Sequence, residues 1–277
     1  MKLTIAKEQI ISGLQAVQNI VSTRTTLPIL SNVLMRADEK QLELTATDLD
    51  VSISCAVEAA VSKPGATTLP VRRLFSIVRE LPALEIELEV DEKNVCALKA
   101  GASFYRINGL GAEEFPPLPK FTDDKKVAIP QDKLRAMLRK TAYAVSMDEA
   151  RYVLNGIFFV FKEHLVTLVA TDGRRLALAE EEVEVSAAAQ GEFIVPTKAI
   201  NELVRLVQSN GEVQVKHTQN QVSFTLRDDK GFTVLVASKL VDGTYPNYRQ
   251  VIPAESKERI ALPREELLQA LHRAEIM

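Results

Sequence analysis

An internal repeat is the feature of this 277-residue sequence that most constrains its fold. The tripeptide Ala46–Thr47–Asp48 recurs as Ala170–Thr171–Asp172, and apolar residues on both sides of it recur at the same spacing of 124 residues. Farther along, the spacing becomes 126 residues at Pro70 and Pro196. It then becomes 127 residues for a set of strand positions, with Ile86, Leu88 and Val95 matching Val213, Val215 and Val222. Loop insertions produce such drift, so we expect successive copies of one module.

A third copy of the pattern begins at Ile260–Ala261–Leu262 and continues through Leu267 and Leu271. One strand and one helix cannot enclose a hydrophobic core. We therefore expect two complete domains, over residues 1–122 and 123–253. Residues 254–277 are expected to supply only the first strand and helix of a truncated third domain.

Within each module the apolar pattern predicts a strand, a helix, several strands, a second helix and further strands. Ile10, Ile11, Leu14 and Val17 have the spacing of one helix face, while residues 51–57 and 86–90 alternate as half-buried strands do. Three helices are expected to have proline as their first residue, where the missing N–H is harmless, at Pro70, Pro130 and Pro196. The predicted fold class is α+β, with helices on one face of antiparallel sheets.

The composition argues against several classes of protein. No apolar run is long enough to span a bilayer and no signal peptide precedes the first module, so we expect a cytoplasmic protein. Cys55 and Cys96 have neither disulfide-framework nor zinc spacing and are expected to be reduced core residues. The histidines His164, His217 and His272 lie in separate elements, and no catalytic or nucleotide-binding motif occurs. We expect no enzymatic activity and no bound cofactor or metal.

The net charge is −3, so any surface for nucleic acid must be local. Arg72 and Arg79, seven residues apart on one predicted helix, recur as Lys198 and Arg205 in the second module. Solvated side chains on outer helix faces are the simpler interpretation of any one helix, but their recurrence favours a shared basic surface. Because no Asn, Gln or aromatic residue recurs with these cations, the surface suits phosphates better than bases.

A second group of charged residues follows the repeated tripeptide in the second module. Asp172–Gly173 followed by two arginines is typical of a turn between strands. Asp48, Asp50 and Asp172 could also be read as magnesium ligands of an enzyme. Because neither a phosphate loop nor a catalytic lysine or histidine accompanies them, a magnesium enzyme is the least favoured interpretation.

Several segments in order give the chain a full-length resemblance to the bacterial DNA polymerase III beta subunit family, the replicative sliding clamps. They are MKLTIAKEQI at the start, TLPILSN at 26–32, ATD at 46–48, RYVLNG at 151–156, ATDGRRL at 170–176 and DGTYPNYR at 242–249. The resemblance implies three similar domains per chain and a ring of two chains joined head to tail. Helices would line the hole and sheets would form the outside.

The resemblance also implies three sets of site residues. DNA contacts are implied for Arg24, Arg72, Arg73, Arg79, Lys198 and Arg205. A pocket for short linear peptides of polymerase, clamp loader and repair proteins is implied at Leu154, Thr171, Gly173, Arg174, Arg175, Leu176, Pro246 and Val251. Ring closure is implied at Tyr105 and Ile107 on one edge, and at Ile276 and Met277 near the other.

Three departures from the family pattern bear on these sites. The loop Met147–Asp148–Glu149 is shorter and more acidic than in some relatives, and Val153 and Gln250 stand where an aromatic residue and an arginine are frequent. The family completes its peptide pocket with carboxyl-terminal residues, which this sequence does not contain. We therefore expect weak DNA binding, residual peptide affinity and a monomer or a weak, concentration-dependent dimer.

The predicted function is that of a non-enzymatic processivity factor, associated with the nucleoid, that encircles duplex DNA without reading its sequence and tethers the replicative polymerase. The alternative is a repeat scaffold that binds peptides at the surface around Leu154 and Leu176 without encircling DNA. An enzyme that acts through Asp48, Asp50 and Asp172 is the remaining possibility.

Overall fold

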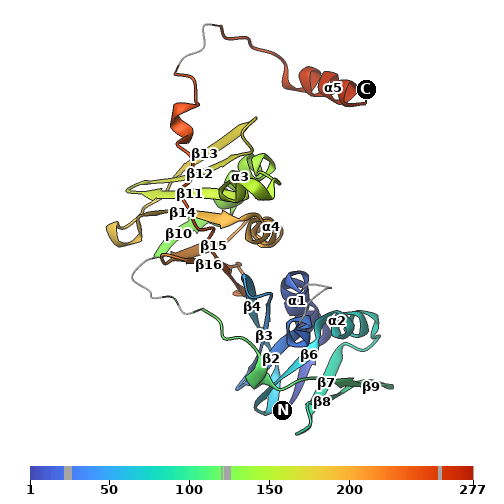
Figure 1. Cartoon of the computed structure of the whole chain (residues 1–277). Coiled ribbons are helices and arrows are strands. Elements are labelled where there is room, and N and C mark those ends of the chain that lie inside the picture. Colours follow the sequence, from blue (N-terminus) through green and yellow to red (C-terminus); the bar gives the residue numbers. More distant parts are fainter. Residues whose placement is uncertain (22–26, 120, 122–125, 255–257, 277) are drawn as a thin grey trace. The chain divides into compact units, whose positions relative to one another are not determined.

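The structure is a computed structural model that describes residues 1–21, 27–119, 121, 126–254 and 258–276 (Figure 1). The chain divides into two compact units, Met1–Tyr245 and Pro246–Met277. The larger unit contains two modules. None of the helices in the described part of the chain has both the length and the apolar character needed to span a membrane.

The first module begins with a strand and a helix and continues with alternating strands and a second helix. Its elements are β1 (Lys2–Ala6), α1 (Lys7–Val17), β2 (Asn32–Asp38), β3 (Gln41–Thr47), β4 (Val51–Glu58), β5 (Ala60–Lys63), β6 (Gly65–Pro70), α2 (Val71–Glu80), β7 (Glu85–Val90), β8 (Val95–Ala100) and β9 (Ser103–Asn108).

The second module repeats this order without a counterpart of β5 among its described residues. Its elements are β10 (Lys126–Pro130), α3 (Gln131–Thr141), β11 (Gly156–Lys162), β12 (Leu165–Thr171), β13 (Leu176–Glu182), β14 (Gly191–Pro196), α4 (Thr197–Leu206), β15 (Glu212–His217), β16 (Gln221–Arg227) and β17 (Thr233–Lys239). In the smaller unit the described residues form one short turn, Tyr248–Gln250, and α5 (Arg264–Glu275).

Three antiparallel sheets organise the larger unit. Five strands follow the order β5-β1-β7-β8-β9, and four follow the order β13-β12-β11-β14. The remaining sheet has eight strands in the order β10-β15-β16-β17-β4-β3-β2-β6, so it runs from the second module into the first. The two modules meet where β17 pairs with β4, with Val236 opposite Ile53.

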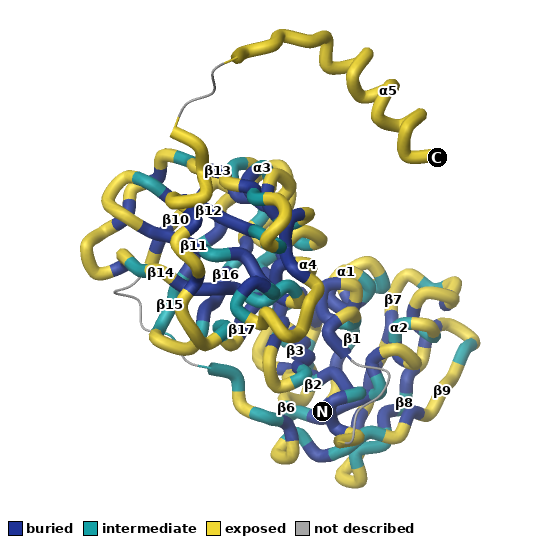
Figure 2. The backbone as a smooth tube through the Cα atoms, turned by 45° about the horizontal axis from the view of Figure 1, so that its top comes forward, coloured by how far each residue is buried: buried dark blue, intermediate teal, exposed yellow. Residues whose placement is uncertain are grey.

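The helices cover the sheets with the apolar faces that the sequence predicts. Ile10, Leu14 and Val17 of α1 are buried, and α1 packs on β4 and beside α2. In the second module α3 packs in the same way on β13. Figure 2 shows the buried residues gathered along the strands, with exposed residues at turns. The predicted α+β fold and the alternation in β4 and β7 are confirmed.

Two predictions of local structure are wrong by one residue. Pro70, Pro130 and Pro196 end their strands and precede their helices, because each keeps an extended ψ between 106° and 149°. Val222 matches Cys96 rather than Val95, since Cys96 lies opposite Val90 and Val222 lies opposite the equivalent His217. A slip of one position in a strand moves a side chain to the other face, and only Cys96 and Val222 share the buried face.

The two cysteines are free and buried, as the sequence predicts. Burial raises the pKa of both the Cys55 and the Cys96 thiol to about 12. Because the thiolate is the reactive form, both side chains remain protonated and unreactive at neutral pH.

We expect neither thiol to be alkylated by iodoacetamide in the native protein at about pH 8, because both are protonated and shielded from solvent. Both should react once urea unfolds the chain. Mass spectrometry of the intact protein counts the modified thiols. Rapid labelling of a fully folded sample would contradict the buried positions.

Candidate nucleic-acid and peptide interfaces

The repeated Thr–Asp sequence builds the same turn in both modules. Asp48 Oδ1 accepts the backbone N–H groups of Asp50 at 3.1 Å and Val51 at 2.7 Å. Asp172 Oδ1 accepts those of Arg174 at 2.9 Å and Arg175 at 3.0 Å. Aspartate side chains favour this local geometry, in which the carboxylate replaces a backbone acceptor. The turn predicted at Asp172–Gly173 is confirmed.

The residue that follows each aspartate has a left-handed backbone. Gly173 has a φ of 83°, which glycine adopts without strain, whereas Leu49 has a φ of 78° at the equivalent position. A leucine with this backbone costs about 1–3 kcal/mol and persists only where surrounding contacts hold it. The turn around Leu49 is therefore held by interactions beyond its own hydrogen bonds.

Two lysines of the second module contact the two carboxylates on either side of Leu49. Lys198 of α4 forms an ion pair with Asp48, and Lys239 of β17 pairs with Asp50 at 3.0 Å. The backbone N–H of Lys239 also donates to Asp50 O at 2.9 Å. Lys198, which the resemblance places against DNA, thus contacts the first module in this structure.

Arg205 of α4 also joins the modules. Its guanidinium donates to the carbonyl oxygens of Gln15 at 3.0 Å and Ala16 at 2.7 Å, in the last turn of α1, and its Nε lies 3.0 Å from Glu202. The last carbonyls of a helix lack partners within the helix, and a cation is favourable there. Arg205 therefore caps α1 across the junction.

The arginines of α2 are more available to solvent. Arg73 is exposed and has no hydrogen-bond or ion-pair partner within the described ranges. Arg72 donates to Val21 O at 3.2 Å, and Arg79 pairs with Glu80 at 3.0 Å. Arg24 lies outside the described residues.

Two further exposed cations were not among the predicted DNA contacts. Arg139 and Lys140 lie in the last turn of α3, and within the described chain neither has a side-chain partner. Equivalent positions of α1 hold Gln15 and Ala16, so a search for recurring charges overlooks them. In the sequence, only the excess of basic residues on this predicted helix pointed to Arg139 and Lys140.

Most residues of the predicted peptide pocket belong to the larger unit. Leu154 is buried at the end of a short helical turn, Glu149–Leu154, and Thr171 lies opposite Leu176 across β12 and β13. Arg175 pairs with Asp172 at 3.1 Å and lies over the Tyr143 ring, while Arg174 is exposed beside Gly173. Pro246 and Val251 belong to the smaller unit, where Val251 is exposed.

The acidic loop Met147–Asp148–Glu149, which precedes this pocket, is held by hydrogen bonds and an ion pair of Asp148. Asp148 accepts the N–H of Ala150 at 3.0 Å and pairs with Arg151 at 2.9 Å, and these interactions hold the pKa of its carboxyl below the usual range. Arg151 also donates to Asp172 O at 3.0 Å, which ties the loop to the Asp172 turn. Val153 lies next to Gly243.

Two stacked aromatic rings lie at the carboxyl-terminal end of the larger unit. Tyr245 stacks on Phe158 of β11 with ring centroids 4.7 Å apart. Burial raises the pKa of the Tyr245 hydroxyl to about 12. At the matching place in the first module, Phe115 packs in a small cluster with Leu30 and Leu34. The repeat therefore extends to the residues that end each module.

The predicted ring-closure residues lie in different surroundings. Tyr105 and Ile107 belong to β9, an edge strand of the five-stranded sheet. Tyr105 is 40% exposed, but Ile107 is only 1% exposed and belongs to the core, so an interface can use only the backbone of Ile107. Ile276 is exposed after α5, and Met277 lies outside the described residues.

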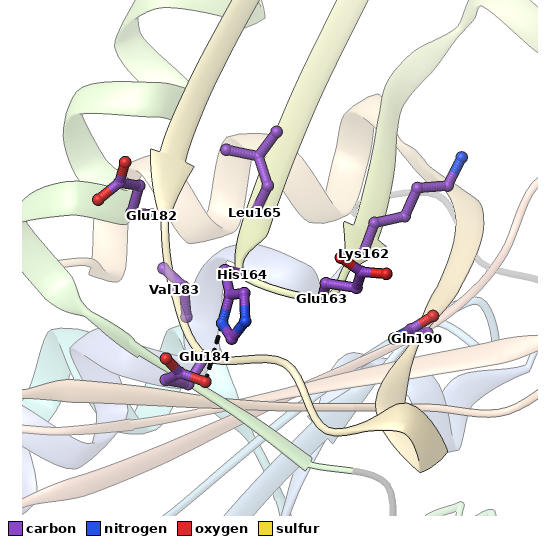
Figure 3. Close-up of a pocket in the computed structure, with 8 residues that line it drawn as sticks. All are labelled: Lys162, Glu163, His164, Leu165, Glu182, Val183, Glu184 and Gln190. Carbon is purple, nitrogen blue, oxygen red and sulfur yellow. Dashed lines mark hydrogen bonds and ion pairs between the residues drawn. The ribbon is translucent and has the colours of Figure 1, made fainter.

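A separate hollow of about 970 Å³ lies beside the turn between β11 and β12 (Figure 3). His164 and Glu184 approach each other across it, with Nδ1 3.1 Å from the carboxylate, and both side chains are exposed. The lining residues include no serine, threonine or cysteine that could act as a nucleophile. Within the described ranges, no three His, Cys, Asp or Glu side chains gather to hold a metal ion.

Arg205→Gln is expected to lower the free energy of unfolding by about 1–3 kcal/mol, because it removes a charged donor from two helix-end carbonyls. Arg79→Gln removes the same charge at the equivalent position of α2 and should change stability by about 0.5 kcal/mol or less. The Arg205 side chain is 31% exposed and that of Arg79 is 62% exposed. Urea denaturation compares the two variants, and equal losses would show that the junction contacts of Arg205 add nothing.

Comparison with known proteins identifies the family. The DNA polymerase III beta subunit N-terminal domain matches residues 1–119, and the central domain of the same subunit matches residues 128–247. The beta sliding clamp of Chlamydia pneumoniae is 32% identical over 98% of this chain and 73% of its own length. That of Bacillus subtilis is 32% identical over 100% of this chain and 74% of its own length.

Solved structures agree with this relationship. A sliding clamp from Pseudomonas aeruginosa bound to griselimycin superposes with a TM-score of 0.92 at 35% identity, over 100% of this chain and 74% of that one. The clamp from Bacillus subtilis gives the same TM-score at 32% identity, over 99% of this chain and 73% of that one. The chain therefore belongs to the DNA polymerase III beta subunit family, the beta sliding clamps.

Proposed function

We propose that this chain is a non-catalytic processivity factor that holds a DNA polymerase on duplex DNA. The observation that carries the proposal is the fusion of two clamp modules through one sheet, with exposed cations on the helices of both modules. Such cations contact phosphates, which carry no sequence information, so the protein can move along DNA. A tethered polymerase has a high effective concentration at the primer end without any change in its chemistry.

The DNA-facing cations divide into two groups in this proposal. Members of the first group can contact phosphates, because within the described residues each has either no partner or one weak surface contact that a phosphate could replace. They are Arg72, Arg73 and Arg79 on α2, and Arg139 and Lys140 on α3. Lys198 and Arg205 mainly hold the two modules together. Arg24 is retained as a proposed contact from the sequence alone. We also retain the domain limits 1–122, 123–253 and 254–277.

The proposed peptide site surrounds the Asp172 turn. Leu154 and Leu176 would accept apolar anchors of a partner peptide, and Thr171, Gly173, Arg174 and Arg175 would border them. Pro246 and Val251 remain proposed members of the site. Partners would include the polymerase, the clamp loader and other replication or repair proteins, acting at the nucleoid in the bacterial cytoplasm.

Retention on DNA distinguishes this function from a peptide-binding scaffold that does not encircle DNA. A clamp loaded on circular DNA should stay bound until the circle is cut, whereas a scaffold should dissociate from both forms at the same rate. Equal retention on circular and linear DNA of the same length would favour the scaffold.

Reversing three charges on α2, in the variant Arg72→Glu, Arg73→Glu, Arg79→Glu, should weaken DNA binding at low salt. The slope of log K against log salt should fall by about 0.9 for every phosphate that the variant no longer neutralises. Electrophoretic mobility shifts over a range of salt concentrations measure both effects.

The matched control is Lys40→Glu, Lys93→Glu, Lys230→Glu, which makes the same charge change at exposed positions outside the helices. The control should retain most of the affinity and the salt slope. A helix variant that behaves like this control would refute the basic helix surface.

Leu176→Asp should weaken binding of a short peptide with apolar anchors by at least about tenfold. Burial of apolar surface contributes roughly 25 cal/mol per Å², and the new carboxylate would lose hydration in the same place. Isothermal titration calorimetry measures the affinity. Leu84→Asp, at an exposed loop position of the first module, is the control and should bind normally. Unchanged binding by Leu176→Asp would place the peptide elsewhere.

A further inference from the structure

One repeated helix position carries a cation in both modules, but its surroundings differ. Arg72 and Lys198 are each the second residue of their helix, α2 and α4. Arg72 donates to the uncharged carbonyl oxygen of Val21 at 3.2 Å, so its charge is not balanced by this contact. Lys198 instead forms an ion pair with the carboxylate of Asp48. The position therefore presents an unbalanced charge in the first module and a balanced one in the second.

The carboxylate of Asp48 is held in place beside Lys198. Its Oδ1 accepts the backbone N–H groups of Asp50 and Val51, and its Oδ2 contacts the lysine. The Asp48 side chain is only 13% exposed, whereas that of Lys198 is 50% exposed. Partly buried pairs are screened by salt less than exposed ones. A phosphate that approaches Lys198 therefore meets a cation already balanced by a fixed carboxylate, which repels the phosphate.

The neighbouring ion pair of the same junction has a different location. Asp50 pairs with Lys239 at 3.0 Å, and both side chains are more than half exposed. Lys239 is the last residue of strand β17, so it does not belong to a helix. Loss of the Asp50 charge would thus release a lysine outside the basic helix surface, whereas loss of the Asp48 charge would release one on α4.

The equivalent aspartate of the second module has a partner within its own turn. Asp172 pairs with Arg175 at 3.1 Å, and Arg175 precedes strand β13. Within the described residues, the Thr–Asp turn therefore balances a helix cation only at the junction between the modules.

We propose that Asp48 is a positioning residue that keeps Lys198 at the module junction and withholds its charge from the phosphates of duplex DNA. The inference rests on the proposed DNA-binding function and names a residue that limits it. At this repeated position, Arg72 would supply the phosphate contact and Lys198 would not. Fewer phosphate contacts mean weaker binding that is less sensitive to salt, which suits a protein that moves along DNA.

Asp48→Asn in the full chain tests the proposal directly. The asparagine oxygen can accept the same two backbone N–H groups, so the turn is kept, but the amide cannot balance the charge of Lys198. Affinity for a duplex oligonucleotide should rise by about fivefold at low salt. The slope of log K against log salt should steepen by about 0.9, because one more phosphate is neutralised. Fluorescence anisotropy over a range of salt concentrations measures both quantities.

The matched control is Asp50→Asn, which removes the same charge and one ion pair of the same junction. It should leave the salt slope unchanged, because the lysine that it releases lies on a strand. Urea denaturation measures how far each variant loosens the junction. A purely structural role of Asp48 would lower stability without steepening the salt slope, and an equal steepening by both variants would overturn the proposal.

A double variant, Asp48→Asn with Lys198→Gln, should return the affinity and the salt slope to those of the unaltered chain. The reason is that the ion pair as a whole contributes no net charge. Arg72→Gln, at the equivalent position of α2, should instead weaken binding and reduce the slope by about 0.9.

These variants separate failure of the proposal from failure of the DNA-binding function. If Arg72→Gln weakens binding but Asp48→Asn leaves the slope unchanged, the charge of Lys198 is not withheld and only the present proposal is wrong. A double variant that binds more weakly than the unaltered chain leads to the same conclusion. If none of the helix variants changes binding, the basic helix surface is refuted, and the role of Asp48 is refuted with it.

Discussion

The pairing of β17 with β4 is the interaction on which the larger unit depends. It joins four strands from each module into one antiparallel sheet, so the two modules share backbone hydrogen bonds and a continuous hydrophobic core. The apolar side-chain pattern fixes the register of this pairing, because a slip of one residue turns every side chain to the other face. Lys198 and Arg205 of α4 contact the Asp48 turn and the end of α1 across this junction.

The same turn serves two purposes because its neighbours differ. In the first module, two carboxylates bind two lysines of the second module, and Leu49 between them has a left-handed backbone. In the second module, Gly173 takes that backbone without strain, and Arg174 replaces the second carboxylate. The first turn therefore belongs to a junction, whereas the second remains at the surface, where we propose the peptide site.

Recurrence of a charge in the sequence does not imply recurrence of its role. Arg79 and Arg205 hold equivalent positions on α2 and α4, yet Arg79 pairs with its exposed neighbour Glu80 while Arg205 caps α1. The difference arises because α4 lies at the junction with the first module, whereas α2 has no described module at the corresponding place.

The sequence by itself determined the repeat, the α+β class, the helix faces, the buried cysteines and the family, because these depend on local periodicity and on ordered motifs. Only the tertiary structure decided that Lys198 and Arg205 join the modules, that Ile107 is buried, and that Cys96 rather than Val95 matches Val222. The physical reason is that a side chain's partners and a strand's register depend on residues distant in sequence. Periodicity shows which face is apolar, but not which carboxylate or carbonyl a cation will meet.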